Sequence, residues 1–308
     1  MFIVAAALLP GIAAMTYYQG LGVLWNIALL LIFCAAIEMA ITAVKGQPSS
    51  NLIVDGSAVV TAILIAVCIP PFVSPGPLFV GAAVAIGLAK HTYGGLGRNI
   101  FNPAMAGYAA MLVSFPLALS TWPSLSGPNM TDGLSGATLL TEFRYREGLT
   151  SSEFRQAFEA AIDQHSLVTL AFAFGGVALV WQRLVQWRIP AALFIGTALG
   201  ALFGWDQGSS ESHGSVWFHI TTGGTVIAAF FVASDPVTHP ENRAQQWLFG
   251  ILVGLLIYVI RAYGAYPDGI AFAILLANCT TPLLDRYART SRDKAAKLSK
   301  TDKTAKNG

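Results

Sequence analysis

The stretch GVLWNIALLLIFCAAIEMAITAV, residues 22–44, carries a single charged side chain, that of Glu38. An apolar run of this length matches the ~20 residues that a helix needs to cross the hydrocarbon core of a bilayer. Much of the 308-residue chain is similar, because 55% of its residues are hydrophobic and only 11% are charged. Soluble domains carry about 25% charged residues. The composition therefore predicts an all-α polytopic integral membrane protein.

Hydropathy along the chain predicts about ten membrane-spanning helices. Their ranges are 2–18, 22–44, 53–71, 77–90, 103–120, 166–182, 189–205, 217–234, 246–261 and 267–284. The fourth span is short, and the sequence Thr-Thr-Gly-Gly at 221–224 interrupts the eighth. Membranes tolerate an interrupted helix only where protein or a cavity covers its backbone. We expect these two spans to be partial or broken helices.

Lysine and arginine are distributed unevenly over the loops. With the basic tail 285–308 in the cytoplasm, 14 of the 18 basic residues lie inside and 4 lie outside. Because cytoplasmic loops carry the excess of basic residues, both termini are predicted to be cytoplasmic and the long loop 121–165 to face outside. Within that loop, LTSSEFRQAFEAAIDQH (149–165) has the start signal and the pattern of an amphipathic surface helix. We expect the tail to be a disordered, positively charged flank.

Two pairs of segments resemble each other across the chain. DGSAVVTAILIAVCIPP (55–71) is echoed by TGGTVIAAFFVASDPV (222–237), and NPAMAGYAAMLVSFP (102–116) by PDGIAFAILLANCTTP (267–282). The spans recur five apart, which predicts a 5+5 inverted repeat, an architecture that builds sites near the membrane midplane. The predicted parts are a first half (1–120), an extracytoplasmic loop (121–165), a second half (166–284) and a cytoplasmic tail (285–308).

The three cysteines, Cys34, Cys68 and Cys279, stand singly in apolar runs without a CxxC motif. This spacing argues against a self-contained zinc, haem or iron–sulfur site, so we predict no metal. No βαβ fingerprint for a dinucleotide occurs either. The sequence predicts that the protein lies in the lipid bilayer, and no nucleic-acid partner is expected.

The segment TDGLSGATLLTEF, residues 131–143, surrounds a threonine with small residues. It follows the pattern D-x-x-[ST]-G-A-T through Asp132, Ser135, Gly136, Ala137 and Thr138. A threonine hydroxyl without a neighbouring base is a poor nucleophile. Thr138 is therefore predicted to be the substrate of another enzyme rather than a catalytic residue. The alternative is a loop turn in which the hydroxyls of Ser135 and Thr138 bond to local backbone.

This motif resembles the flavinylation signature of the family that includes the D subunit of bacterial Rnf electron transport complexes and the B subunit of the Na⁺-translocating NADH:quinone reductase. From about residue 5 to 290 the chain is similar to that family, through DGSAVVTAILIAVCIPP, YGGLGRNIFNPAMAGYAAMLVSFP, SDPVT and YPDGIAFAILLANCTTPLLD. The resemblance implies a ten-helix inverted repeat in the bacterial inner membrane. It also implies FMN esterified through its phosphate to Thr138 on the periplasmic side, by a flavin transferase.

The same resemblance implies other complex subunits as partners, electron relay through FMN, and coupling to Na⁺ or H⁺ movement. Without an NADH-binding unit, we expect no stand-alone enzyme activity. The first span begins almost at Met1, whereas relatives usually carry a preceding cytoplasmic segment, which fits a shortened start. Because the relatives from the quinone reductase have a still longer extension, its absence favours the Rnf relatives.

A glycine-rich inside loop, KHTYGGLGRNIFNPAMAGY (90–108), leads to the next span. Gly94 and Gly95 allow close backbone approach, and Asn102 precedes a proline suited to a first helical turn. Because the relatives from the quinone reductase bind riboflavin, the resemblance implies a second, non-covalent flavin here. The alternative is a membrane turn whose small residues serve helix packing.

Four acidic residues lie within or at the ends of spans: Glu38, Asp55, Asp235 and Asp268. Ionisable groups at membrane depth cost at least ~2.5 kcal/mol, so they are candidates for a Na⁺ or H⁺ pathway. Glu38 is the foremost candidate, whereas the three aspartates equally suit caps and turns beside glycine or proline. A cofactor-free channel or transporter gated by Asp55 and Asp268, or a membrane scaffold, is the functional alternative.

Overall fold

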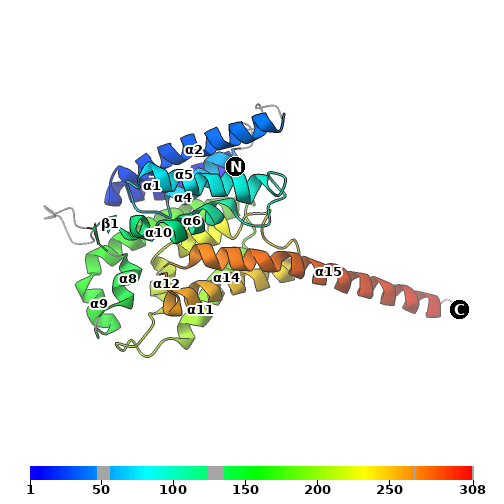
Figure 1. Ribbon diagram of the computed structural model, residues 1–308. Helices are drawn as coiled ribbons and strands as arrows, with labels where there is room; N and C mark the ends of the chain where they lie inside the picture. The colour runs from blue at the N-terminus through cyan, green and yellow to red at the C-terminus, as the bar shows by residue number, and fades with distance from the viewer. Residues whose placement is uncertain (47–55, 124–134, 137, 147, 267, 307–308) are drawn as a thin grey trace.

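The computed structural model describes residues 1–46, 56–123, 135–136, 138–146, 148–266 and 268–306. Within these residues the chain is helical apart from turns and one pair of two-residue strands (Figure 1). The first part contains α1 (Phe2–Gln19), α2 (Gly22–Val44), α4 (Ser57–Ala66), α5 (Pro75–Ala82), the π-helix η1 (Ala83–His91), α6 (Pro103–Ser114) and α7 (Pro116–Ser120).

The strands and two short helices connect this part to the second. They are β1 (Trp122–Pro123), β2 (Ser135–Gly136), α8 (Leu139–Arg144) and α9 (Ser151–Ala157). The second part contains α10 (Glu159–Trp181), α11 (Arg188–Phe203), α12 (Val216–Thr221), α13 (Thr225–Ile227), the π-helix η2 (Ala228–Val232), α14 (Arg243–Tyr263) and α15 (Ile270–Lys306). Figure 1 shows α8 and α9 at the opposite end of the helical body from the free end of α15.

Four of the described helices are long and apolar enough to cross a membrane, namely α1, α2, α10 and α14. Three more, α4, α6 and α11, are apolar but shorter. The all-α class predicted from composition is therefore confirmed, and the chain is of the multi-pass membrane type. Several of the predicted spans are present as shorter or broken helices.

The eighth predicted span is broken where the sequence indicated. Helix α12 ends at Thr221, Thr222 is extended, and Gly223 adopts a left-handed conformation with φ 65° before α13 starts at Thr225. Only glycine takes up such a φ angle without steric cost. The fourth span continues from α5 into the π-helix η1, and the fifth is divided between α6 and α7 at Phe115, directly before Pro116.

Two expectations for polar segments are wrong. The tail is helical rather than disordered from 285 to Lys306, because α15 continues through it without a glycine or proline between Pro282 and Lys306. The surface helix at 149–165 is not a single helix either. Its predicted start signal is present as a capping box at Thr150, but α9 ends at Ala157, and Glu159 begins the long helix α10.

Glycine allows the closest helix contacts. A Cβ atom at Gly175 of α10 would lie 1.8 Å from the carbonyl oxygen of Ala7 in α1, and one at Gly254 of α14 would lie 2.1 Å from that of Leu193 in α11. Small residues at such crossings let backbones approach, which is how helices associate in lipid. The buried apolar residues of both parts form one continuous core. A smaller cluster lies beneath α8 and α9 and includes Leu139, Phe143 and Phe154.

Candidate functional site

Thr138 occupies the N-cap position of α8. Its backbone is extended, with φ −67° and ψ 154°, and its Oγ1 accepts a hydrogen bond from the backbone N–H of Thr141 at 3.2 Å. The hydroxyls of Thr138 and Thr141 also lie 2.8 Å apart. Threonine is a favoured N-cap because its oxygen satisfies one of the unpaired N–H groups of the first turn. The local backbone bond proposed as the alternative for Thr138 is thus present.

Aromatic packing fixes the helix that follows Thr138. Phe143 is buried, with its ring centroid 5.0 Å from that of Phe154 on α9 and 4.3 Å from that of Phe218 on α12. Centroid separations in this range are those of favourable aromatic pairs. Helix α8 is therefore attached both to its neighbour in the loop and to the broken span of the second part.

Arg146 ties the same region to the loop between α11 and α12. Its guanidinium donates to the carbonyl oxygens of Phe143 at 2.9 Å, Ser210 at 2.7 Å and Ser212 at 2.5 Å. Burial among neutral groups lowers the pKa of Arg146, although arginine stays charged at any physiological pH. A charged donor shared among carbonyls makes stronger hydrogen bonds than a neutral one. Arg146 therefore fixes the C-terminal end of the α8 segment.

A cavity of about 660 Å³ lies beside Thr138. Thr138, Leu139, Leu140 and Thr141 line one side, and residues of α1, α6 and α10 line others. Binding sites for small molecules and cofactors commonly enclose ~300–1,000 Å³ and have mostly apolar walls with few polar groups. Six aromatic residues contribute to the lining: Tyr18, Tyr108, Trp122, Tyr145, Phe172 and Tyr266.

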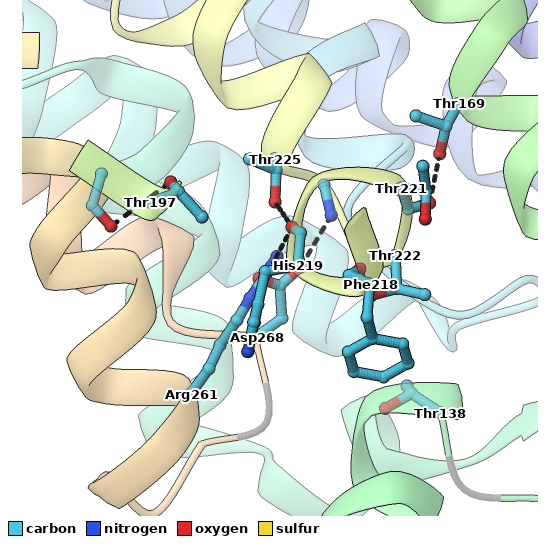
Figure 2. Close-up of polar contacts among 12 residues, drawn as sticks. Thr138, Thr169, Thr197, Phe218, His219, Thr221, Thr222, Thr225, Arg261 and Asp268 are labelled. Carbon is cyan, nitrogen blue, oxygen red and sulfur yellow. Dashed lines mark hydrogen bonds and ion pairs between the residues drawn. The ribbon is translucent and has the colours of Figure 1, made fainter. Parts of the chain in front are cut away.

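The break between α12 and α13 forms another part of the wall. Gly223, Gly224 and Asp268 all border the cavity. Asp268 forms an ion pair with Arg261, whose Nη2 lies 2.9 Å from the Asp268 Oδ1, and its Oδ2 accepts the N–H of Gly224 at 3.1 Å. Arg261 Nη1 donates to the carbonyl oxygen of His219 at 2.8 Å (Figure 2). A charged network therefore holds the broken span beside the cavity.

The other acidic residues predicted from sequence lie elsewhere. Glu38 is buried in an ion pair with Lys90. Asp235 is in the turn after η2, where it accepts the N–H of Val237 at 3.2 Å, as the turn alternative predicted. Asp55 lies outside the described residues. Of the three acids that the structure describes, Asp268 is the one that lines the cavity beside Thr138.

The structure describes part of the motif D-x-x-[ST]-G-A-T at 132–138. Asp132 and Ala137 lie outside the described residues. Ser135 and Gly136 form β2, in which Gly136 pairs with Trp122 and Ser135 with Pro123. The motif threonine therefore follows directly after a short sheet.

The glycine-rich loop lies against a second, smaller hollow of about 420 Å³, which Arg98, Asn99, Asp285 and Arg286 help to line. Gly94 and Gly95 both have positive φ angles, 106° and 98°. Asn102 is buried and caps α6 by accepting the N–H of Met105 at 3.2 Å. These three residues are not among those that line the hollow.

Sequence reasoning missed the basic partners in both buried networks. Lys90 and Arg261 each stand at the end of an apolar run, so each was counted as a loop charge. In the structure both are buried, with side chains 3% and 1% exposed. The sequence did contain a signal for these ion pairs. Each basic residue stands at the end of a predicted span, and an acidic residue lies within or at the end of another span.

Comparison with known proteins covers nearly the whole chain. A sequence model of the NQR2, RnfD, RnfE family matches residues 1–294. The D subunit of the ion-translocating oxidoreductase complex of Ectopseudomonas mendocina is 39% identical over 305 residues, covering 93% of this chain and 88% of that protein. The protein of the same name in Cellvibrio japonicus is 37% identical over 337 residues, covering 100% and 94%. The chain belongs to the NQR2, RnfD, RnfE family.

Proposed function

We propose that this chain is the flavin-carrying D subunit of an Rnf-type ion-translocating oxidoreductase complex in the membrane. In this proposal FMN is joined covalently to Thr138, and electrons pass through it between partner subunits while Na⁺ or H⁺ crosses the membrane. The observation that carries the proposal is the position of the Thr138 hydroxyl on the wall of a cavity of about 660 Å³.

The residues around the cavity fit a flavin. An isoalloxazine ring is flat and aromatic, and the lining supplies aromatic side chains from several helices, among them Tyr108 and Tyr266. The polar side chains of the lining are Gln19, Ser120, Thr138, Thr141, Gln164, His165, Thr169 and Asp268. Bound there, the flavin would supply the electron-transfer chemistry, and the protein would supply binding, orientation and electrostatics. Thr138 would hold the phosphate end, because its Oγ1 is the atom to be esterified.

The arrangement of the helices supports the proposed inverted repeat. Helices α1 and α10, which begin the two halves, pack on each other, and so do α6 and α15, which end them. Helix α2 contacts α5 and η1, as α11 contacts α14. Each half also directs a basic side chain toward its third predicted span: Lys90 donates to the Ser57 hydroxyl at 2.5 Å, and Arg261 donates to the backbone carbonyl of His219.

The proposed orientation has independent support. The excess of basic residues assigns the tail to the cytoplasm, and α8 and α9 lie at the opposite end of the body (Figure 1). Thr138 would then face the periplasm, where a covalent bond keeps FMN from diffusing away. The relatives' printed name, which makes them subunits of a complex, supports partner subunits for this chain. A second flavin near the loop at 94–102 stays part of the proposal, supported by the neighbouring hollow.

Coexpression with a flavin transferase tests the proposal. The wild-type chain should fluoresce as a flavoprotein on a denaturing gel, and intact mass should show one added FMN. Thr138→Val should abolish both signals. Thr150→Val is the matched control, because Thr150 also caps a short helix of the same loop but does not line the cavity. Both signals retained in Thr138→Val would mean that the flavin is attached to another residue and would overturn the assignment to Thr138. A wild-type chain without flavin would favour a cofactor-free transporter.

A further inference from the structure

Asp268 brings a formal charge to the cavity wall. Among the described lining residues it is the only one of the types Asp, Glu, Lys and Arg. Its side chain is 26% exposed, whereas that of its partner Arg261 is 1% exposed. The carboxylate therefore lies at the cavity surface, and the positive charge lies behind it.

The pair is held by several contacts rather than by one. Besides Asp268, Arg261 contacts the His219 carbonyl oxygen, which also accepts the hydroxyl of Thr225 at 2.6 Å. The Asp268 carboxylate is fixed at its second oxygen by the N–H of Gly224. A Cβ atom at Gly223 would lie 2.6 Å from Arg261 Nη2 and 3.1 Å from Asp268 Oδ2, so the network needs a residue without a side chain there. The orientation of the pair is thus built into the broken span.

An oriented charge pair acts on any redox group in the same cavity. Within protein, where the effective dielectric constant is lower than in water, a nearby charge has a larger effect on the energy of an added electron. A carboxylate at the surface repels that electron, and the buried guanidinium compensates only in part because it is farther back. Charge close to a flavin ring is one of the means by which a protein sets the electronics of the ring.

We propose that Asp268, oriented by Arg261 and Gly224, lowers the reduction potential of the flavin held in this cavity. The proposal rests on the proposed attachment of FMN to Thr138. It gives Asp268 the part of an electrostatic tuning residue, and Arg261 and Gly224 the part of positioning residues. It requires no covalent step by any of the three.

The test compares Asp268→Asn with Asp163→Asn in the full chain coexpressed with the transferase. Both changes remove one negative charge at the same end of the molecule, but Asp163 is exposed on α10 and is screened by water. The measurement is a spectroelectrochemical titration of flavin absorbance, after gel fluorescence has established equal loading. We expect Asp268→Asn to shift the equilibrium toward the reduced flavin at least tenfold, or about 59 mV for one electron. Asp163→Asn should shift it less than twofold.

Asp268→Asn leaves Arg261 without its carboxylate partner, which destabilises the fold. A second variant keeps the test informative if the single variant folds poorly. The double change Asp268→Asn/Arg261→Met removes both charges, and we expect a smaller upward shift of at least twofold. A potential within twofold of wild type in the variants that load flavin would overturn the tuning role while leaving the flavin assignment intact. A wild-type chain without flavin would instead remove the proposed function.

Discussion

Glu38 and Lys90 form a buried ion pair between α2 and η1, with each side chain 3% exposed. Lys90 also donates to the Ser57 hydroxyl at 2.5 Å, and His91 Nε2 lies 3.5 Å from the Glu38 carboxylate. Glu38 was the foremost candidate for a sodium or proton site. A cation that bound to the Glu38 oxygen shared with Lys90 would have to displace the ammonium group, so ion binding at that oxygen depends on the opening of this pair.

We predict that removing one charge of this pair destabilises the protein more than removing both charges. Glu38→Gln or Lys90→Met leaves a buried charge without its partner, which costs about 3–5 kcal/mol. The double variant removes both charges and should recover a large part of that loss. Thermal unfolding of the four proteins in detergent gives the coupling free energy. Single variants as stable as wild type would contradict a buried pair.

Close contact between α1 and α10 predicts the effect of a single methyl group. Gly175→Ala should lower the free energy of unfolding by about 1–3 kcal/mol, because the added carbon meets the Ala7 backbone and forces the helices apart. Gly87→Ala is the control, since no atom lies within 4 Å of the added carbon. That change should be neutral or stabilising by up to ~1 kcal/mol. Equal melting temperatures for both variants would argue against the α1–α10 contact.

The carbonyl contacts of Arg146 predict a link between loop structure and flavin loading. Arg146→Ala removes a buried charged donor from several carbonyl oxygens and should destabilise the α8 segment by about 2–3 kcal/mol. Amide exchange in 139–146 should speed up, and the flavin yield on Thr138 should fall. Arg155→Ala is the control, because Arg155 is exposed on α9. Unchanged exchange after Arg146→Ala would mean that the loop is held by its aromatic cluster alone.

The capping box of α9 predicts a pH dependence. Glu153 accepts hydrogen bonds from the Thr150 backbone N–H at 2.8 Å and from the Thr150 hydroxyl at 2.7 Å, which lowers the pKa of Glu153. Because the folded pKa is depressed, the contribution to stability is complete above the ordinary glutamate pKa of about 4.3. It is lost as the pH falls through the lower, folded value.

Amide exchange at the start of α9, corrected for the intrinsic effect of pH, measures this dependence. Protection should fall between pH 5 and pH 3 in wild type, at about the pKa range of a carboxyl group. Glu153→Gln should show weaker protection that is flat over the same range. A parallel fall in both proteins would assign the effect to another group.

Local signals in this sequence predicted local structure. The Thr-Thr-Gly-Gly segment at 221–224 predicted the break in the eighth span, and the Ser and Thr residues at 150–152 predicted a helix start, because both depend on residues a few positions apart. The apolar runs predicted helices for the same reason. By contrast, the pairs Glu38–Lys90 and Arg261–Asp268 depend on how separate helices pack, and periodicity in one segment carries no information about that.

The candidate site shows the same division. Thr138 was found from a motif of adjacent residues, but the cavity beside it is assembled from α1, α6, α10 and the broken span as well. Its shape follows from tertiary packing alone. The break at Phe158 and the helical tail were mispredicted because polar composition was taken as a sign of surface or disorder, whereas Glu159 continues directly into an apolar run.

The pairing of Trp122 with Gly136 joins the chain before 124–134 to the chain after it. The two ends of that segment are therefore neighbours, whatever its length. The entropic cost of joining two fixed chain ends grows only slowly with the number of residues between them, by about 0.6 kcal/mol for each doubling. Thr138 follows the second strand and would stay in its place through such changes. Residues that precede Asp132 in this segment can thus be inserted or deleted without moving Thr138, the proposed attachment residue.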